Sequence, residues 1–286
     1  MTAVSIPTDA RLTFGGILRS EWVKLVSLRS TVWCYVILVV LTIGMTALLA
    51  GLSGVGVPEE GAGAFSSEAV QSTWLQTATV GTNLGQLVVA VLGAIVITGE
   101  YGTGMIRSTF AAVPGRTAAL VGKIVVFGGV TFVVSFVSLV ISALLAAPLL
   151  AANGYAVDVA DGNVWLGLVG AAGFVTLIGL MALGIGTILR NTAGAIATAL
   201  GLLLVLPGIL QIFAAVTQIE WLFDVVAFLP SSAGAALTSY PTAPVEYPPG
   251  MFVPLTLEPV QALLVLIAWV AVPLVVGAVL LKRRDS

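Results

Sequence analysis

The ionisable side chains nearest to the ends of the long apolar stretches include one carboxylate and one amine. Glu100 follows one apolar run, and Lys123 lies at the start of the next. A carboxylate and an ammonium at the ends of two membrane spans can form an ion pair at the interface or contact a partner protein. The residue types alone leave both alternatives open.

Two amide side chains occur within an apolar run. Asn83 and Gln86 are three residues apart, so they share one face of a helix. In a membrane, amides placed in this way either line a pathway and contact a substrate or form hydrogen bonds between helices. We therefore mark Asn83 and Gln86 as possible pathway residues and keep the second alternative open.

The residue types that most catalytic and metal sites need are scarce. The chain has no His, no phosphate-binding G-x-x-x-x-G-K-[ST] sequence and no H-E-x-x-H sequence. Gly184 and Gly186 lie within an apolar stretch, where helix packing is their expected role. Span interiors without charged residues also disfavour an ion-coupled carrier and a membrane hydrolase. We predict no catalytic residue, metal site or cofactor on this chain.

The composition indicates what must position these few polar groups. Of 286 residues, 59% are hydrophobic and 8% are charged, and the mean hydropathy is +1.13. Soluble domains carry roughly 25% charged residues. A chain this apolar lacks the polar surface of a soluble globule, so we predict an all-α, polytopic membrane protein with a single transmembrane domain over residues 1–286.

Six apolar windows are long enough to cross a bilayer, which takes about 20 residues per helix. They run approximately over residues 31–52, 74–98, 118–150, 164–189, 193–216 and 259–281. The third window is longer than one crossing needs, so it starts in the interface, tilts or breaks near Pro148. Only three residues around Arg190 separate the fourth and fifth windows, which predicts a tight hairpin.

The basic residues support the same count of spans. All 11 Lys and Arg residues fall before the first window, between the second window and the start of the third (Lys123), between the fourth and fifth, or after the sixth. With six spans these segments share one side, and the remaining loops carry only acidic charges. The positive-inside rule makes the basic side cytoplasmic, with both termini inside.

Two further segments are predicted to be helical without crossing the membrane. Residues 11–28 carry Phe14, Leu18, Trp22 and Leu25 on one face and polar residues such as Lys24 on another, which predicts an amphipathic helix in the inner interface. The alternative is that this segment only begins the first span. Residues 219–229 are too short and too charged to span, so we predict an interfacial or partly re-entrant helix on the outer side, stopped by Pro230 and followed by a structured, proline-rich loop.

The longest internal loop on the basic side runs from Glu100 to Arg116. Residues 103–113 can form a short helix ended by Pro114. Such a helix on the cytoplasmic surface can dock a soluble motor protein, and an ordinary solvated loop is the alternative.

At this loop the sequence resembles the ABC-2 type permeases of bacterial ABC exporters. The resemblance rests on Gly99-Glu100-Tyr101, Thr103-Gly104-Met105-Ile106-Arg107-Ser108-Thr109, Pro114-Gly115-Arg116 and Lys123. The N-terminal Arg19-Ser20-Glu21-Trp22-Val23-Lys24-Leu25 and Arg29-Ser30-Thr31 resemble the same group, especially its actinobacterial members. Many relatives carry a basic residue after Glu-Tyr, where this chain has Gly102.

The resemblance implies a half-transporter in the bacterial plasma membrane. Two permease chains, identical or homologous, would pair with two ABC ATPase subunits that hold ATP and Mg²⁺. Residues 11–28, with Trp22 and Lys24, would match the family's connecting helix. Residues 217–229 would match its external gate helices. The residues of its ATPase-coupling loop would be Glu100, Tyr101, Thr103, Arg107, Pro114 and Arg116, and those of the gate segment Trp221, Phe223 and Phe228.

These expectations favour the permease subunit of an ATP-driven exporter for a hydrophobic or amphipathic compound, such as a drug, a natural product or a lipid-linked molecule. The bilayer is the surrounding medium, and no nucleic-acid partner is expected. A membrane sensor or regulator that does not transport, such as a resistance partner, is the main alternative. A membrane enzyme is the second alternative, and the missing acid–base groups disfavour it.

Overall fold

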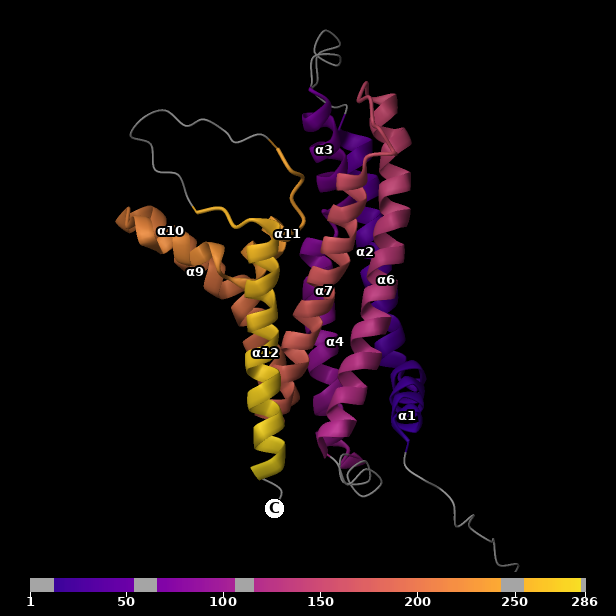
Figure 1. Ribbon diagram of the computed structural model, residues 1–286, viewed down its shortest axis with the longest axis vertical. Coiled ribbons are helices and arrows are strands. Elements are labelled where there is room, and N and C mark those ends of the chain that lie inside the picture. Colours follow the sequence, from indigo (N-terminus) through magenta and orange to yellow (C-terminus); the bar gives the residue numbers. More distant parts are fainter. Residues whose placement is uncertain (1–12, 54–65, 106–115, 243–254, 284–286) are drawn as a thin grey trace, which may run out of the picture.

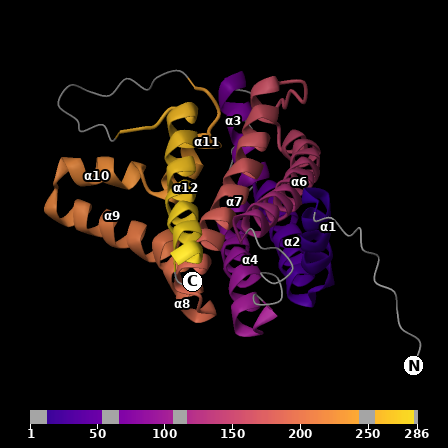
Figure 2. The same ribbon diagram turned by 60° about the horizontal axis from the view of Figure 1, so that its bottom comes forward.

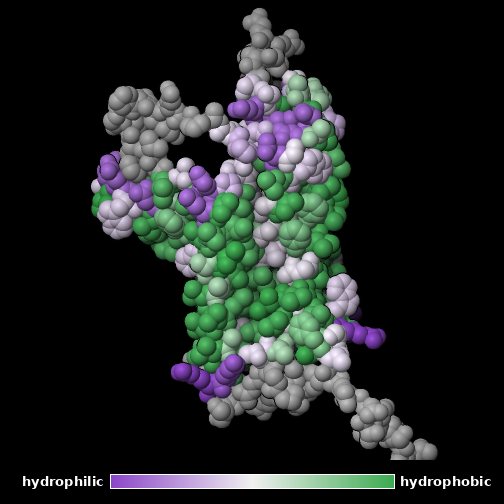
Figure 3. Space-filling view, in the orientation of Figure 1, coloured by the Kyte–Doolittle hydropathy of each residue, from purple (hydrophilic) through white to green (hydrophobic). Residues whose placement is uncertain are grey.

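The computed structural model describes residues 13–53, 66–105, 116–242 and 255–283, and all regular structure in these ranges is helical. Six helical stretches in them are long and apolar enough to cross a membrane, which confirms the predicted all-α architecture. The helices that Figure 1 shows side by side along the long axis of the molecule are α2 (Arg29–Leu52), α3 (Ser67–Thr79) with α4 (Thr82–Gly102), α6 (Arg116–Ala152), α7 (Gly162–Leu189) and α12 (Pro259–Arg283). A broad hydrophobic belt covers the middle of the visible face, and hydrophilic side chains gather near its ends (Figure 3).

The first span is preceded by a short helix that runs across the bundle. Helix α1 covers Phe14–Ser27 and begins at Thr13, whose hydroxyl accepts a hydrogen bond from the Gly16 amide at 3.2 Å. Leu28 is extended and separates α1 from α2, Arg29–Leu52. Figure 1 views α1 nearly along its axis, whereas α2 runs vertically. The interfacial helix predicted over residues 11–28 is therefore a separate helix, and residues 11 and 12 lie outside the described ranges.

The second apolar stretch is made of two helices instead of the single one predicted over residues 74–98. Helix α3 covers Ser67–Thr79 and α4 covers Thr82–Gly102. At the break, the backbone of Gly81 lies so close to Thr42 of α2 that a Cβ atom would overlap it. The Thr46 hydroxyl of α2 lies 3.1 Å from the carbonyl oxygen of Thr77 and 3.3 Å from that of Ala78. Carbonyl groups freed at a break need such donors in an apolar medium.

Helix α6, Arg116–Ala152, is continuous through Pro148. Its 37 residues would extend about 55 Å at 1.5 Å per residue, well beyond a hydrocarbon core of about 30 Å. Of the predicted alternatives for this window, a break at Pro148 is therefore excluded.

Helix α7, Gly162–Leu189, lies at the centre and packs against α4, α6 and α12. Glycines permit this close packing. A Cβ on Gly184 would lie 2.9 Å from the Leu274 nitrogen of α12, and one on Gly186 would lie 2.6 Å from Ile97 of α4. The predicted packing role of Gly184 and Gly186 is thus confirmed.

The hairpin predicted around Arg190 is present. Arg190 adopts the left-handed conformation after α7, and the Asn191 side chain accepts from the Gly194 amide at 2.8 Å to begin α8, Thr192–Leu200. A π-helical turn, Gly201–Val205, then leads into α9, Leu206–Thr217, with Pro207 near its start. Wide turns and prolines redirect helices. Figures 1 and 2 show α9 leaning away from the bundle.

Two short helices and the last span complete the chain. Helix α10 covers Glu220–Ala227, as predicted for the segment stopped by Pro230. Pro230 also begins α11, Pro230–Leu237, where a loop was predicted; that prediction was wrong because Pro is well suited to the first turn of a helix. Helix α12, Pro259–Arg283, closes the bundle, and its Trp269 indole donates to the Phe228 carbonyl at 2.9 Å.

Candidate functional site

The described basic residues gather at one end of the bundle. They lie on α1, at the start of α2, near the start of α6, in the α7–α8 hairpin and at the end of α12, which all meet at the lower end of Figure 1. These residues are Arg19, Lys24, Arg29, Arg116, Lys123, Arg190, Lys282 and Arg283. The described acidic residues lie towards the opposite end, with two exceptions, Glu21 and Glu100.

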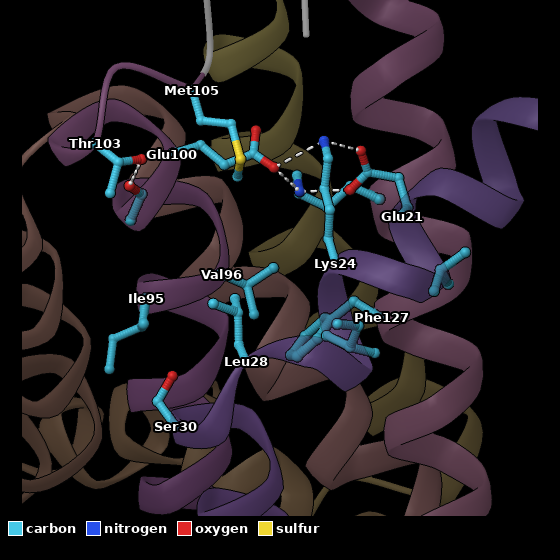
Figure 4. A pocket seen from close by; sticks show the side chains of 14 residues that line it. Glu21, Lys24, Leu28, Ser30, Ile95, Val96, Glu100, Thr103, Met105 and Phe127 are labelled. Carbon is cyan, nitrogen blue, oxygen red and sulfur yellow. Dashed lines mark hydrogen bonds and ion pairs between the residues drawn. The ribbon is translucent and has the colours of Figure 1, made fainter. Parts of the chain in front are cut away.

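These two carboxylates bind two of the lysines in a buried charge cluster, which we define as Glu21, Lys24, Glu100 and Lys123 (Figure 4). The Lys123 ammonium lies 2.6 Å from Glu21 Oε2 and 2.8 Å from Glu100 Oε1. The Lys24 ammonium lies 2.6 Å from Glu21 Oε1 and 3.1 Å from Glu100 Oε1. Three of these ion pairs join α1, α4 and α6 to one another, and the fourth, Lys24–Glu21, lies within α1.

Because these ion pairs are buried, the loss of one partner is expected to be costly for stability. The side chains of Glu21, Glu100 and Lys123 are 3%, 4% and 6% exposed, while that of Lys24 is 23% exposed. Removing one member of a buried ion-pair network leaves an uncompensated charge in a poorly solvated site. The four residues are thus expected to act as a unit that keeps α1 attached to the bundle.

Helix α1 presents a different face to the bundle from the one that its apolar pattern suggested. Ile17, Glu21 and Leu25 are buried, whereas Phe14 and Trp22 are about half exposed. The apolar stripe that contains Phe14 and Trp22 does not include Glu21, so this stripe did not predict Glu21 as a site residue. A carboxylate at the centre of an Ile17–Glu21–Leu25 stripe was the available signal, since such a position needs a buried partner.

Lys24 gives a pH test of the cluster. Burial opposes its charge, but the hydrogen bond and attraction of Glu21, together with the attraction of Glu100, outweigh it and raise the pKa of Lys24 above 10.5. Its contribution to folding stability is then fully present below pH 10.5 and is lost as the pH rises through the higher folded pKa. We expect the difference in unfolding temperature between wild type and Lys24→Met to shrink above pH 10.5. An unchanged difference up to pH 12 would contradict this assignment.

The predicted coupling-loop residues divide between helix ends and the segment outside the described residues. Glu100 and Tyr101 belong to the last turn of α4, not to a loop, and Thr103 follows that helix with its hydroxyl donating to the Gly99 carbonyl at 2.8 Å. Arg116 is the first residue of α6. Arg107, Pro114 and most of the predicted short helix over residues 103–113 lie outside the described residues.

The end of α4 also contacts the α7–α8 hairpin. The Arg190 guanidinium carbon lies 5.1 Å from the centroid of the Tyr101 ring. The Thr192 hydroxyl donates to that of Thr98 at 2.9 Å. The last turn of α4 is therefore held on one side by the charge cluster and on the other by the hairpin.

The other predicted site residues lie away from this cluster. Gln86 is buried and Asn83 is exposed, and their amide groups donate to the carbonyls of Asn83 and Val80. Both amide donors thus serve the first turns of α4 after the Gly81 break, and their pathway role stays a prediction. Trp221 and Phe228 are 62% and 45% exposed, and Phe223 lines a pocket with residues 255–257. The gate role of these aromatics also stays a prediction.

Comparisons with known proteins identify the family. A family model described as ABC-2 family transporter protein matches residues 16–286. A search of curated proteins gives no match. The family match spans every described helix, with α1 included from its third residue. The chain therefore belongs to the ABC-2 transporter family, whose members are membrane components of ABC transporters and normally work with an ABC ATPase.

Proposed function

We propose that this chain is the permease subunit of an ABC exporter that moves a hydrophobic or amphipathic compound out of the cytoplasm. Two permease chains, identical or homologous, would pair with two ATPase subunits, and ATP and Mg²⁺ would bind to those subunits. Membership of the ABC-2 family supports the transport role, and the apolar interior favours a lipophilic cargo.

The sidedness of the charges supports the membrane topology that the proposed export requires. Among described residues, the basic ones lie at one end of the bundle, and the positive-inside rule assigns that end to the cytoplasm. The chain would then be a multi-pass protein of the bacterial plasma membrane with both termini inside. Helices α10 and α11 would lie on the outer side, where an export gate is needed.

The observation that carries a coupling mechanism is the position of the buried charge cluster. Glu100 lies near the end of α4 and Lys123 near the start of α6, on either side of the segment that would dock on the ATPase. Both side chains bind the same carboxylate–ammonium pair on α1. ATPase movement at the docking segment would therefore displace α4, α6 and α1 together, which couples ATP binding to the spans.

The docking proposal predicts a loss of ATPase association on charge reversal. Arg107→Glu and Arg116→Glu should each weaken the ATPase–permease affinity by about fivefold, since rim charges typically contribute on the order of 1 kcal/mol, and should reduce the amount of ATPase that co-purifies in mild detergent. Transport into inside-out vesicles should fall in parallel. The measurement is the ratio of ATPase to permease after affinity purification.

Lys282→Glu is the matched control, because Lys282 is an exposed basic residue on the same end but on α12. It should leave co-purification and transport near wild type. Unchanged association and transport in both arginine variants would count against docking at this loop. A native complex that contains no ATPase at all would favour the sensor or regulator instead.

A further inference from the structure

A pocket of about 400 Å³ lies directly against the buried charge cluster, between α1, α4 and α6. Its volume falls within the range of small-molecule sites, roughly 300–1,000 Å³. In Figure 4 the side chains of Glu21, Lys24 and Glu100 converge at one end, and those of Ile95, Val96, Leu28 and Ser30 lie away from them. The pocket is thus amphipathic, with apolar walls and a charged end.

The two carboxylates at the charged end differ in how their oxygens are used. Each oxygen of Glu21 binds one lysine, at 2.6 Å in both cases. Both lysine contacts of Glu100 fall on Oε1, and its enclosed Oε2 has no hydrogen-bond partner among the described residues. An enclosed carboxylate oxygen without a donor is unfavourable, and a carboxylate accepts several hydrogen bonds.

The wall near this oxygen can adapt to a ligand. Met105 lines the pocket together with Thr103 and Glu100 at the end of α4. An unbranched thioether side chain has three rotatable bonds and readily changes shape. A donor group can therefore approach Oε2 when Met105 rotates, while an apolar body rests against Leu28, Val96 and Phe127.

The charges around the pocket select the donor. Both lysines already lie between two carboxylates, so an added anion would meet the Glu21 and Glu100 charges at close range. The unused group is an acceptor on an anionic side chain, and charge-assisted N⁺–H···O⁻ hydrogen bonds are the strong kind. We propose that this pocket binds an amphipathic amine, with its ammonium N–H on Glu100 Oε2 and its apolar body between α1, α4 and α6.

Dodecylamine is a direct probe of this site, and dodecyltrimethylammonium, which has the charge but no N–H donor, is its comparator. The full-length chain is placed in phosphatidylcholine nanodiscs, and unfolding is followed with a thiol-reactive dye on Cys34, the single cysteine. Saturating dodecylamine, at about 100 times its Kd, should raise the Tm by roughly 5–10 °C. The trimethyl analogue should raise it far less, and an equal rise with both compounds would overturn the proposal.

Variants locate the effect. Glu100→Gln should abolish the dodecylamine shift, whereas Glu21→Gln, which also weakens the cluster, should keep it because both Glu21 oxygens already bind lysines. Val96→Phe fills the apolar part and should also abolish the shift, while Val40→Phe, at a position 62% exposed on α2, should not. A full shift in Glu100→Gln or in Val96→Phe would overturn the site. If Glu100→Gln fails to fold, the Val96→Phe variant and the comparison of the two amines still test whether the amine binds in this pocket.

The same ammonium chemistry occurs in aminophospholipid headgroups and in free amphipathic amines, and the nanodisc composition distinguishes them. If the headgroup is the natural occupant, added phosphatidylethanolamine should raise the basal Tm of wild type but not of Glu100→Gln, and should reduce the further shift by dodecylamine. If free amines are the natural occupants, phosphatidylethanolamine should change neither value. Binding is measured without ATPase, so this result is independent of export.

Discussion

Replacing Lys123 by Met is expected to destabilise the chain by about 3–5 kcal/mol and to lower its Tm on the order of 10 °C. Lys123 is the most enclosed cation of the cluster, and its ammonium lies 2.6 Å from Glu21 and 2.8 Å from Glu100. Met keeps most of the apolar side-chain volume but leaves two buried carboxylates with Lys24 as their only described cation. The measurement is thermal unfolding in mild detergent.

Transport should fail before folding does in this variant. Because Glu21 is on α1 and Glu100 is on α4, weakening their shared cation loosens the attachment of α1 to the spans. We expect ATPase association to persist while transport per ATP hydrolysed falls at least tenfold. The two readouts separate a loss of coupling from a loss of docking.

Lys282→Met provides the control, since the same substitution at an exposed site on α12 should change stability by less than about 0.5 kcal/mol. The double variant Glu21→Gln/Lys123→Met should be more stable than the sum of the single effects, by about 0.5–3 kcal/mol, because the pair is in direct contact. Strict additivity, or a Lys123→Met protein as stable as wild type, would refute an energetic role for the cluster.

Gly93→Leu is expected to lower the free energy of unfolding by a similar amount, roughly 3 kcal/mol or more, because the added side chain has no room. Gly93 is on α4, and a Cβ atom at this position would overlap the backbone carbonyl of Gly179 on α7. Backbone cannot rotate aside as a flexible side chain can, so the two helices must separate. Because α7 is the central helix, the loss should appear as poor recovery of folded protein and an early thermal transition.

The matched control is Gly44→Leu on α2, where an added Cβ meets nothing within 4 Å. This exposed helical position should tolerate Leu and gain up to about 1 kcal/mol from its higher helix propensity. The measurements are size-exclusion profiles and thermal unfolding curves of Gly93→Leu and Gly44→Leu. Equal behaviour of the two variants would show that the α4–α7 approach does not limit stability.

The sequence by itself determined the architecture and the distribution of charge. Apolar runs longer than 20 residues have few alternatives to spanning helices, because only intrahelical hydrogen bonds satisfy the backbone in hydrocarbon. The hairpin at Arg190 was equally local, since a three-residue interruption leaves room only for a turn. The family resemblance was also carried by contiguous residues, and the match over residues 16–286 confirms it.

Helix breaks were harder to predict from the sequence, because the groups that stabilise a break come from other helices. The break at Gly81 depends on the close backbone of Thr42 and on the Thr46 hydroxyl, more than thirty residues away along the chain. The change in direction at α9 comes from a π-helical turn together with Pro207. The hydropathy of this stretch alone predicts a single uninterrupted span. Average hydropathy carries no information on either feature.

Only the tertiary structure decided which charges meet. Glu100 and Lys123 were visible as neighbours of the membrane edge, but an interfacial pair and a partner contact were equally compatible with their positions. Lys24 and Glu100 are 76 residues apart, and Lys123 and Glu21 are 102 apart. Their meeting requires α1 to turn at Leu28 and to lay its Ile17–Leu25 face against α6. A buried charge is tolerable only beside its counter-charge, so the packing of three helices, and not local sequence, assigned these four residues to one site.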